Sequence, residues 1–152
     1  MKIRLKIFVA VCVILSAAGC GGSDKGGETD IPYYGSWVLT RWQDAELPGM
    51  IYLQLKKDGS FNLYQSLQTF GFKQFTGSYL LSEDGTRLSG SYTGGTPWES
   101  SYVIEKHTKE ELWLRSEKDG NVSVYTETEI PDYVKDNVTD KDTRAAAEAP
   151  FL

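Results

Sequence analysis

The sequence alternates apolar and polar residues at every second position over residues 35–129, whereas a helix would need a period near 3.6. Turn signals recur about every dozen residues in this stretch. They include Asp-Gly pairs at 58–59, 84–85 and 119–120, which are typical of tight hairpins because both central residues of such a turn need positive φ. The pattern predicts an all-β domain in which successive strands pair antiparallel.

Eight strands are predicted, at residues 36–42, 50–56, 60–65, 75–82, 87–93, 99–106, 111–117 and 122–128. Alternation puts one set of side chains on the inner face: Ile51, Leu53, Leu55, Phe61, Leu63, Leu88, Gly90, Tyr102, Ile104, Leu112, Leu114, Val122 and Val124. Antiparallel strands joined by short turns can close on themselves and leave no exposed edge. We therefore expect an eight-stranded antiparallel up-and-down barrel, with a two-sheet sandwich of the same strands as the alternative.

The residues after the last predicted strand lack the two-residue alternation of the strands. Residues 131–138 start with Pro131 at a suitable first helical position and carry a partial apolar stripe of Tyr133, Val134 and Val138. That segment is compatible with a short helix against the barrel wall. Residues 139–152 are first charged and then Ala-rich, and we expect them to be a loosely ordered tail. The barrel domain is accordingly expected at residues 33–138.

The N-terminus has the layout of an export signal. Three basic residues among the first six precede an apolar stretch at 7–18, which is too short for a membrane span. Ala17-Ala18-Gly19-Cys20 resembles a bacterial lipobox, in which the cysteine sulfur receives a diacylglyceryl group before cleavage. This predicts a lipoprotein signal peptide at residues 1–19, lipidation of Cys20 and a flexible tether at 20–32. The alternative is a secreted protein that is cut near Ala18, with Cys20 a chance thiol.

Charge and composition argue against several classes of function. Three of the 16 Lys and Arg lie in the leader, which leaves 13 against 21 Asp and Glu, a net charge of −8. That balance disfavours nucleic acid and anionic headgroups as partners. The single histidine, His107, falls in a predicted turn, and the two cysteines lie in or next to the leader, so few groups remain for metal or nucleophilic chemistry. We expect no enzymatic activity, no cofactor and no metal.

Short motifs in the strands resemble a known family. Gly35-Ser36-Trp37 matches the G-x-W signature with which lipocalins start their first strand. Together with the stretches at 52–61 and 77–79, the segment resembles the small lipocalin-like lipoproteins of Bacteroides-type bacteria, over about residues 34–134. His107-Thr108-Lys109 stands where lipocalins carry T-D-Y. The resemblance implies a ligand-carrying or interaction barrel and an outer-membrane location, and it supplies no ligand.

Loop lengths indicate which end of the barrel is open. The turns at 57–60, 83–86 and 107–110 share one tight rim, whereas the opposite rim carries longer loops at 43–49, 66–74 and 94–97. Binding residues tend to lie on long loops, so this rim is the expected mouth. Inward-facing residues nearest to it are the predicted ligand-binding set: Arg41, Gln65, Tyr92, Trp98 and Ser100. The first strand starts at the tight rim, so we expect the mouth to face away from the membrane.

Two functions remain in competition. The first is a lipid-anchored barrel that binds a small, apolar or amphipathic ligand at its mouth. The second is a solid barrel, filled by its own aromatic side chains, that acts as an interaction or inhibitor module and binds a protein partner. Four aromatic residues with expected outward positions motivate the second reading: Trp42, Tyr52, Trp113 and Tyr125.

Overall fold

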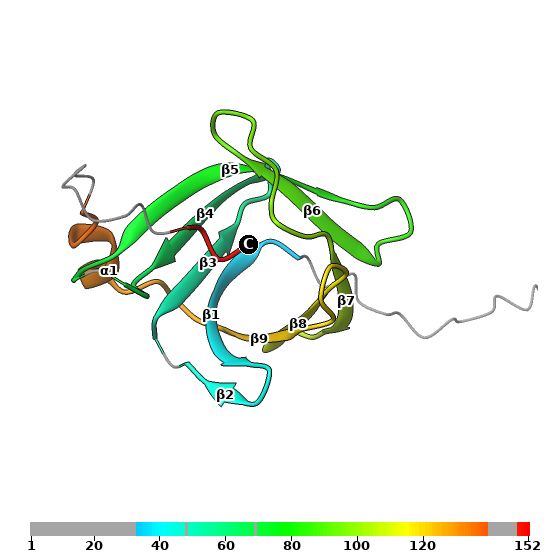
Figure 1. The fold of residues 1–152 in the computed structure, drawn as a ribbon, viewed down its shortest axis with the longest axis horizontal. Helices are drawn as coiled ribbons and strands as arrows, with labels where there is room; N and C mark the ends of the chain where they lie inside the picture. Colours follow the sequence, from blue (N-terminus) through cyan, green and yellow to red (C-terminus); the bar gives the residue numbers. More distant parts are fainter. Residues whose placement is uncertain (1–32, 48, 69, 140–148) are drawn as a thin grey trace, which may run out of the picture.

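The computed structural model describes residues 33–47, 49–68, 70–139 and 149–152 of the chain. The expected signal peptide, Cys20 and the tether lie outside these residues. In the described part, the strands form one antiparallel sheet in the order β2-β1-β3-β4-β5-β6-β7-β8-β9, and a β1–β9 pairing closes it into a barrel (Figure 1). The strands are β1 (Gly35–Trp42), β2 (Ala45–Glu46), β3 (Ile51–Leu55), β4 (Ser60–Gln65), β5 (Lys73–Leu81), β6 (Arg87–Tyr92), β7 (Tyr102–His107), β8 (Glu111–Ser116) and β9 (Val122–Glu127).

The expected eight-stranded up-and-down barrel is therefore confirmed. The two-residue strand β2 is an addition that folds back on the end of β1, where Trp42 pairs with Ala45. The sixth predicted strand is shorter than expected, because β7 begins at Tyr102. Residues 98–101 instead form a non-strand segment that is held to β6 by a hydrogen bond from the Trp98 N–H to the Gly90 carbonyl oxygen (2.9 Å).

A β-bulge in β1 changes which side chains face inward. Leu39 pairs with Tyr125 and Arg41 with Val124, so Thr40 is an extra residue on the β1 side of the ladder. Its hydroxyl donates to the Val124 carbonyl oxygen (3.1 Å). Beyond the bulge the alternation is shifted by one residue, which turns Arg41 outward. The prediction that Arg41 points into the barrel is wrong for this reason.

The inner face otherwise follows the predicted alternation, except in β9. Every predicted apolar inner residue of β3, β4, β6, β7 and β8 belongs to the main core or packs against it. In β9, Tyr125 is fully buried in that core, and Ser123 pairs with the inward Leu114. The prediction that Val122 and Val124 face inward is wrong. Val124 is nevertheless buried, because it lies on the outer face between Arg41 and Trp113.

A short helix covers part of the outer wall. Helix α1 (Asp132–Asp136) follows Pro131, within the segment proposed from the sequence, and buries Val134 completely. Val134 and Ile130 pack on the outward aromatic residues Tyr52, Tyr64 and Phe72. The chain then pairs Val138 with Phe72 at the start of β5, which brings it to the rim of the barrel. This cluster explains why Tyr52 is outward and yet only 5% exposed.

The last four residues lie inside the barrel opening. We expected loose order for residues 139–152; the described residues 149–152 instead enter the ring of strands, where the C-terminus is seen in Figure 1. Leu152 is 1% exposed and belongs to the main core, and Phe151 packs against that core. These contacts place the C-terminal segment at the rim that was expected to be the mouth.

Candidate functional site

Four of the five residues predicted to bind a ligand come together at the mouth. Gln65 and Tyr92 end β4 and β6, and Trp98 and Ser100 lie in the segment before β7. Gln65, Tyr92 and Trp98 are buried, and Ser100 is half-buried. Arg41, in contrast, is exposed on the outer face, with its guanidinium carbon 5.3 Å from the centre of the Trp113 ring. The mouth thus contains the predicted aromatic and amide groups without the predicted cation.

Trp42 takes the inward place that alternation assigned to Arg41. The bulge pairs Trp42 with the inward residue Ser123, and the Trp42 ring meets the Phe151 ring edge-on at 5.9 Å. Trp42 remains 37% exposed, so it forms a lip of the mouth rather than part of the closed core. The expectation that Trp42 points outward is wrong, because no local sequence signal marks the position of the bulge.

The C-terminal segment is held by two of the predicted ligand-binding residues. The Gln65 side-chain amide donates from Nε2 to the Ala149 carbonyl oxygen, and its Oε1 accepts the Phe151 N–H, both at 2.8 Å. The Tyr92 hydroxyl donates to the main-chain oxygen of Leu152 at 2.6 Å. Both polar side chains face the opening, as predicted, and they hydrogen-bond a peptide backbone there.

A pocket of about 300 Å³ opens beside the C-terminal segment. Its wall combines apolar groups, including Trp42, Leu47 and Leu67, with the hydroxyls of Ser100, Ser116, Ser123 and Tyr102. Polar and charged side chains also line it: Glu99, Lys118, Asp119 and Asn121. Ala149, Pro150 and Phe151 form one side of this wall. A mixed wall of this size lies at the lower end of the range for small-molecule sites. Below the pocket, the barrel is filled by its own aromatic residues: Phe61, Tyr92, Trp98, Tyr102 and Tyr125.

Trp98 is positioned by two glycines on the inner face. A Cβ atom at Gly90 would lie 2.5 Å from a carbon of the Trp98 ring, and one at Gly77 would lie 2.8 Å from the Phe61 ring. The absence of side chains there lets the Phe61 and Trp98 rings meet edge-on at 5.2 Å. Trp98 therefore forms the bottom of the mouth, and close packing fixes its ring.

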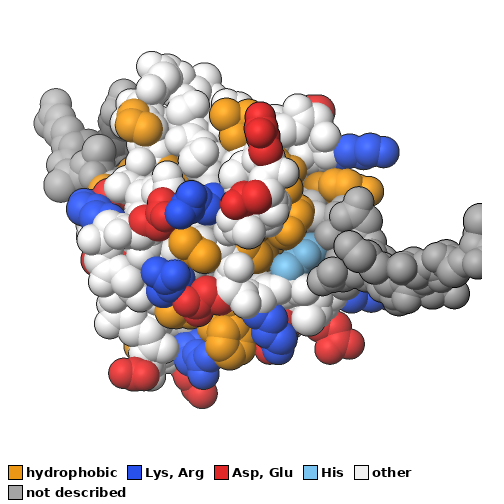
Figure 2. Space-filling view, turned by 90° about the vertical axis from the view of Figure 1, so that its right-hand side faces the viewer, with side chains coloured by type: hydrophobic (Ala, Val, Ile, Leu, Met, Phe, Trp, Pro, Cys, Tyr) orange, Lys and Arg blue, Asp and Glu red, His pale blue; other side chains and the backbone are white. Residues whose placement is uncertain are grey.

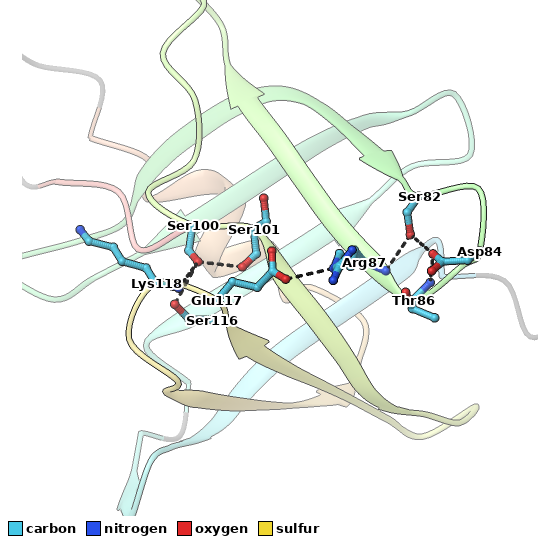
Figure 3. Close-up of polar contacts among 9 residues, drawn as sticks. All are labelled: Ser82, Asp84, Thr86, Arg87, Ser100, Ser101, Ser116, Glu117 and Lys118. Atoms are coloured by element: carbon cyan, nitrogen blue, oxygen red, sulfur yellow. Dashed lines mark hydrogen bonds and ion pairs between the residues drawn. The ribbon is translucent and has the colours of Figure 1, made fainter.

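Ser100 connects two loops of the mouth (Figure 3). Its Oγ accepts hydrogen bonds from the Ser116 hydroxyl (3.0 Å) and the Lys118 N–H (3.1 Å), and donates to the Ser101 carbonyl oxygen (2.7 Å). Nearby, Arg87 pairs with Glu117 at 3.0 Å and links β6 to the end of β8. Ser100 lines the pocket, and its hydroxyl is already engaged in holding the wall together.

Tyrosines dominate the electrostatics inside the barrel. Burial raises the pKa of Tyr102 to about 12 and raises the pKa values of Tyr92 and Tyr125 well above their usual range. All three are therefore neutral hydroxyl groups at physiological pH. The buried Tyr125 Oη has no hydrogen-bond partner within bonding distance among the described residues. The aromatic interior of the mouth thus offers neutral hydroxyl groups, whereas Glu99, Lys118 and Asp119 add charged side chains to the pocket wall.

His107 lies at the opposite, closed rim. It ends β7 and is half-buried, with its ring stacked on Tyr33 at 4.4 Å and edge-on to Trp37 at 6.1 Å. The Tyr33 hydroxyl donates to the Gly85 carbonyl oxygen in the β5–β6 turn (2.9 Å). The described chain therefore begins at the closed rim, far along the barrel from the mouth. Burial lowers the pKa of His107.

The outer surface carries charges of both signs side by side. In Figure 2 acidic and basic side chains are interspersed over the visible face. On the outer surface, ion pairs such as Lys106–Glu111 and Arg115–Glu105 join neighbouring strands. Within the described ranges, no group of three or more His, Cys, Asp and Glu residues could hold a metal ion, and no helix has the length and apolarity to cross a membrane.

Comparison with known proteins identifies the fold. No protein-family model and no curated protein matches this sequence. Among solved structures, the chain is similar to a lipocalin-like protein from Bacteroides uniformis, with 21% identity, a TM-score of 0.52, and coverage of 62% of this chain and 97% of that one. An uncharacterized protein from Bacteroides eggerthii matches with 18% identity, a TM-score of 0.49, and coverage of 64% and 100%. The barrel that the G-x-W motif and the strand pattern predicted is thus a lipocalin-like fold, shared with a protein of Bacteroides.

Proposed function

We propose that this protein is an exported lipocalin-like lipoprotein, anchored to the outer membrane through Cys20, that binds a small, partly apolar ligand at the barrel mouth. The observation that supports ligand binding is the pocket of about 300 Å³, whose wall combines aromatic and aliphatic groups with hydroxyl, amide and charged side chains. Burial of apolar ligand surface against Trp42, Leu47 and Leu67 would supply most of the affinity. The hydroxyl groups would orient the polar end of the ligand.

The arrangement of the two rims supports the anchoring geometry. Tyr33 is fixed at the closed rim, and the tether precedes it in the sequence, so a lipid on Cys20 would hold this rim towards the membrane. The mouth would then open away from the membrane. The net charge of −8 expected for the mature chain supports a role without nucleic acid.

A catalytic role is not part of the proposal. The buried tyrosine hydroxyls of the mouth are neutral, the charged residues Glu99, Lys118 and Asp119 line its pocket, and the histidine lies at the other end of the barrel. The exposed-aromatic argument for a protein-binding role is weakened, because Tyr125 is inside the core and Tyr52 lies under α1. Trp113 is half-buried, with Lys106 and Arg41 over its ring.

Ligand binding is tested with the full mature chain and 1-anilinonaphthalene-8-sulfonate, a small aromatic amphiphile that fluoresces in apolar sites. We expect saturable binding that decanol displaces. Ser123→Phe would fill the pocket and weaken binding at least tenfold, whereas Ser89→Phe, on the outward side of β6 opposite the exposed Leu80, would leave it unchanged. Equal binding by the two variants would show that the probe does not use the mouth.

Anchoring is tested separately in cells by labelling with an alkyne-bearing fatty acid. We expect label on the wild-type protein and recovery in the outer-membrane fraction. Cys20→Ala should abolish both. A labelled Cys20→Ala variant, or an unlabelled wild-type protein, would refute the anchor without bearing on the pocket.

A further inference from the structure

The way the mouth holds residues 149–152 defines a ligand chemistry. Both polar atoms of the Gln65 amide bind the same short segment: Nε2 donates to the Ala149 carbonyl oxygen, and Oε1 accepts from the Phe151 N–H, two residues further along. This is the pattern by which a side-chain amide reads a peptide backbone, since it supplies one donor and one acceptor. The Tyr92 hydroxyl adds a bond to Leu152. Three hydrogen bonds therefore recognise main-chain atoms.

Side chains of the segment fill apolar space on either side of these bonds. Leu152 is 1% exposed within the main core, and the Phe151 ring meets Trp42 edge-on. Gln65 is fully buried, so its amide would be costly to leave without partners in a dry site. The mouth is thus shaped for an apolar group that is directly followed or preceded by an amide.

The open pocket and the space that residues 149–152 fill are parts of one site. Ala149, Pro150 and Phe151 line the pocket themselves, so their departure would enlarge it and expose Gln65 and Tyr92 to an incoming molecule. Residues 149–152 belong to no helix or strand, and their hydrogen bonds to Gln65 join positions 84 and 86 residues apart in the sequence. The contacts of this segment are those of a bound peptide.

We infer that the mouth binds peptide-like ligands, in which an apolar group adjoins an amide, and that residues 149–152 of the chain compete with such ligands for Gln65 and Tyr92. The inference rests on the proposed ligand-binding function and specifies its ligand class. A ligand must displace the segment. The measured association constant therefore equals the intrinsic one multiplied by the fraction of molecules in which the mouth is open. A weakened segment should therefore raise the affinity for any ligand of this site.

The test compares the full chain with its Phe151→Ala/Leu152→Ala variant. The probe is a dansylated Ala-Pro-Phe-Leu-amide peptide, measured by fluorescence anisotropy. We expect the variant to bind the peptide about five- to thirtyfold more tightly than the full chain does. Phe70→Ala, which removes a fully exposed ring from the β4–β5 loop, is the matched control and should bind like the full chain. A dansylated Ala-Pro-Ala-Ala-amide peptide should bind none of the three proteins.

Two further variants test the recognition itself. In the Phe151→Ala/Leu152→Ala background, Gln65→Leu should reduce peptide affinity at least tenfold. Tyr92→Phe, which removes one hydroxyl and preserves the ring packing on Phe61 and Phe75, should reduce it severalfold and keeps the test valid if Gln65→Leu does not fold. If neither Tyr92→Phe nor Gln65→Leu changes the peptide affinity, these two residues do not recognise the peptide and the inference is overturned.

The outcomes separate this inference from the proposed function. If the anilinonaphthalene probe binds the full chain and the double variant equally while the peptide binds neither, small-ligand binding stands and the competition is refuted. If the peptide binds the double variant while the anilinonaphthalene probe and decanol bind no form, the peptide-like ligand class stands and the proposal of a general apolar ligand fails. Equal peptide affinity for the full chain and the double variant refutes the competition.

Discussion

Leu152→Ala should destabilise the protein much less than its burial alone suggests. A leucine that is 1% exposed in a rigid core would cost about 2–5 kcal/mol when truncated. If residues 149–152 leave the mouth as a unit, as the inferred competition requires, further truncation of the undocked segment costs nothing. The loss is therefore limited to the free energy with which the segment docks.

That docking free energy can be estimated from the contacts. Burial of Leu152 contributes about 2 kcal/mol and the half-buried Phe151 about 1 kcal/mol. The hydrogen bonds from Gln65 and Tyr92 and from the Phe151 N–H contribute about 1 kcal/mol each. Ordering four residues opposes this with about 4–5 kcal/mol. The net is about 1–2 kcal/mol, which sets the limit for any change in the segment.

The assay is urea unfolding, followed by far-ultraviolet circular dichroism with a common m-value. Leu152→Ala is expected to cost about 1–2 kcal/mol, and Phe151→Ala/Leu152→Ala no more than that. Leu63→Ala, a fully buried residue of β4, serves as the reference and should cost about 3 kcal/mol. The segment does not dock as a separable unit if Leu152→Ala costs as much unfolding free energy as Leu63→Ala. The same holds if the double variant loses the separate costs of truncating Phe151 and Leu152 added together.

Further predictions concern the wall, the closed rim and the bulge. Gly77→Ala should cost several kcal/mol in urea unfolding, because its Cβ would lie 2.0 Å from the Ser91 carbonyl oxygen; Gly94→Ala, whose Cβ meets nothing but whose φ is +106°, should cost about 1 kcal/mol. His107 is predicted to titrate below its ordinary pKa, so the unfolded state takes up a proton first and stability falls as the pH drops below about 6.5, until the folded pKa is passed. Unfolding at pH 7.5 and pH 5.5 measures this, and a His107→Gln variant with the same pH slope would contradict it. Arg41→Gln should leave binding of the anilinonaphthalene probe unchanged, whereas Trp42→Ala should weaken it severalfold; the reverse order would show that the bulge does not set the lining of the mouth.

The barrel could be predicted from the sequence because the alternation of each strand is a local property. Each hairpin needs only its own alternation and its own turn, so Asp58-Gly59 and Asp84-Gly85 mark turns in the sequence without reference to the rest of the chain. Loop length is equally local, and it located the mouth and four of the residues in it. The closed rim followed from the same comparison.

The predicted inward or outward direction of side chains was wrong where contacts with a neighbouring strand decided the direction. Thr40 is an ordinary strand residue in the sequence, and its role as the extra residue of a bulge depends on how β1 meets β9. In β9, the valines were placed inside because they are apolar. Val124 is instead buried on the outer face beside Trp113, and the long side chains of Arg41 and Lys106 extend over that ring. Tyr125 could then occupy the core.

The prediction of a loosely ordered tail from composition did not account for the last residues of the segment. An Ala-rich, charged stretch favours loose order, yet Pro150-Phe151-Leu152 ends it with two large apolar side chains, whose exposure would be unfavourable by about 3–5 kcal/mol in total. Strand β9 ends at the closed rim, where Glu127 pairs with Trp37, and the chain then runs along the outer wall until Val138 pairs with Phe72 at the rim of the mouth. This path brings the apolar residues 150–152 close to the apolar opening of the barrel. The same apolar character that closes the mouth in this chain is what an outside ligand would have to bring, so the segment and the ligand are expected to differ in affinity rather than in kind.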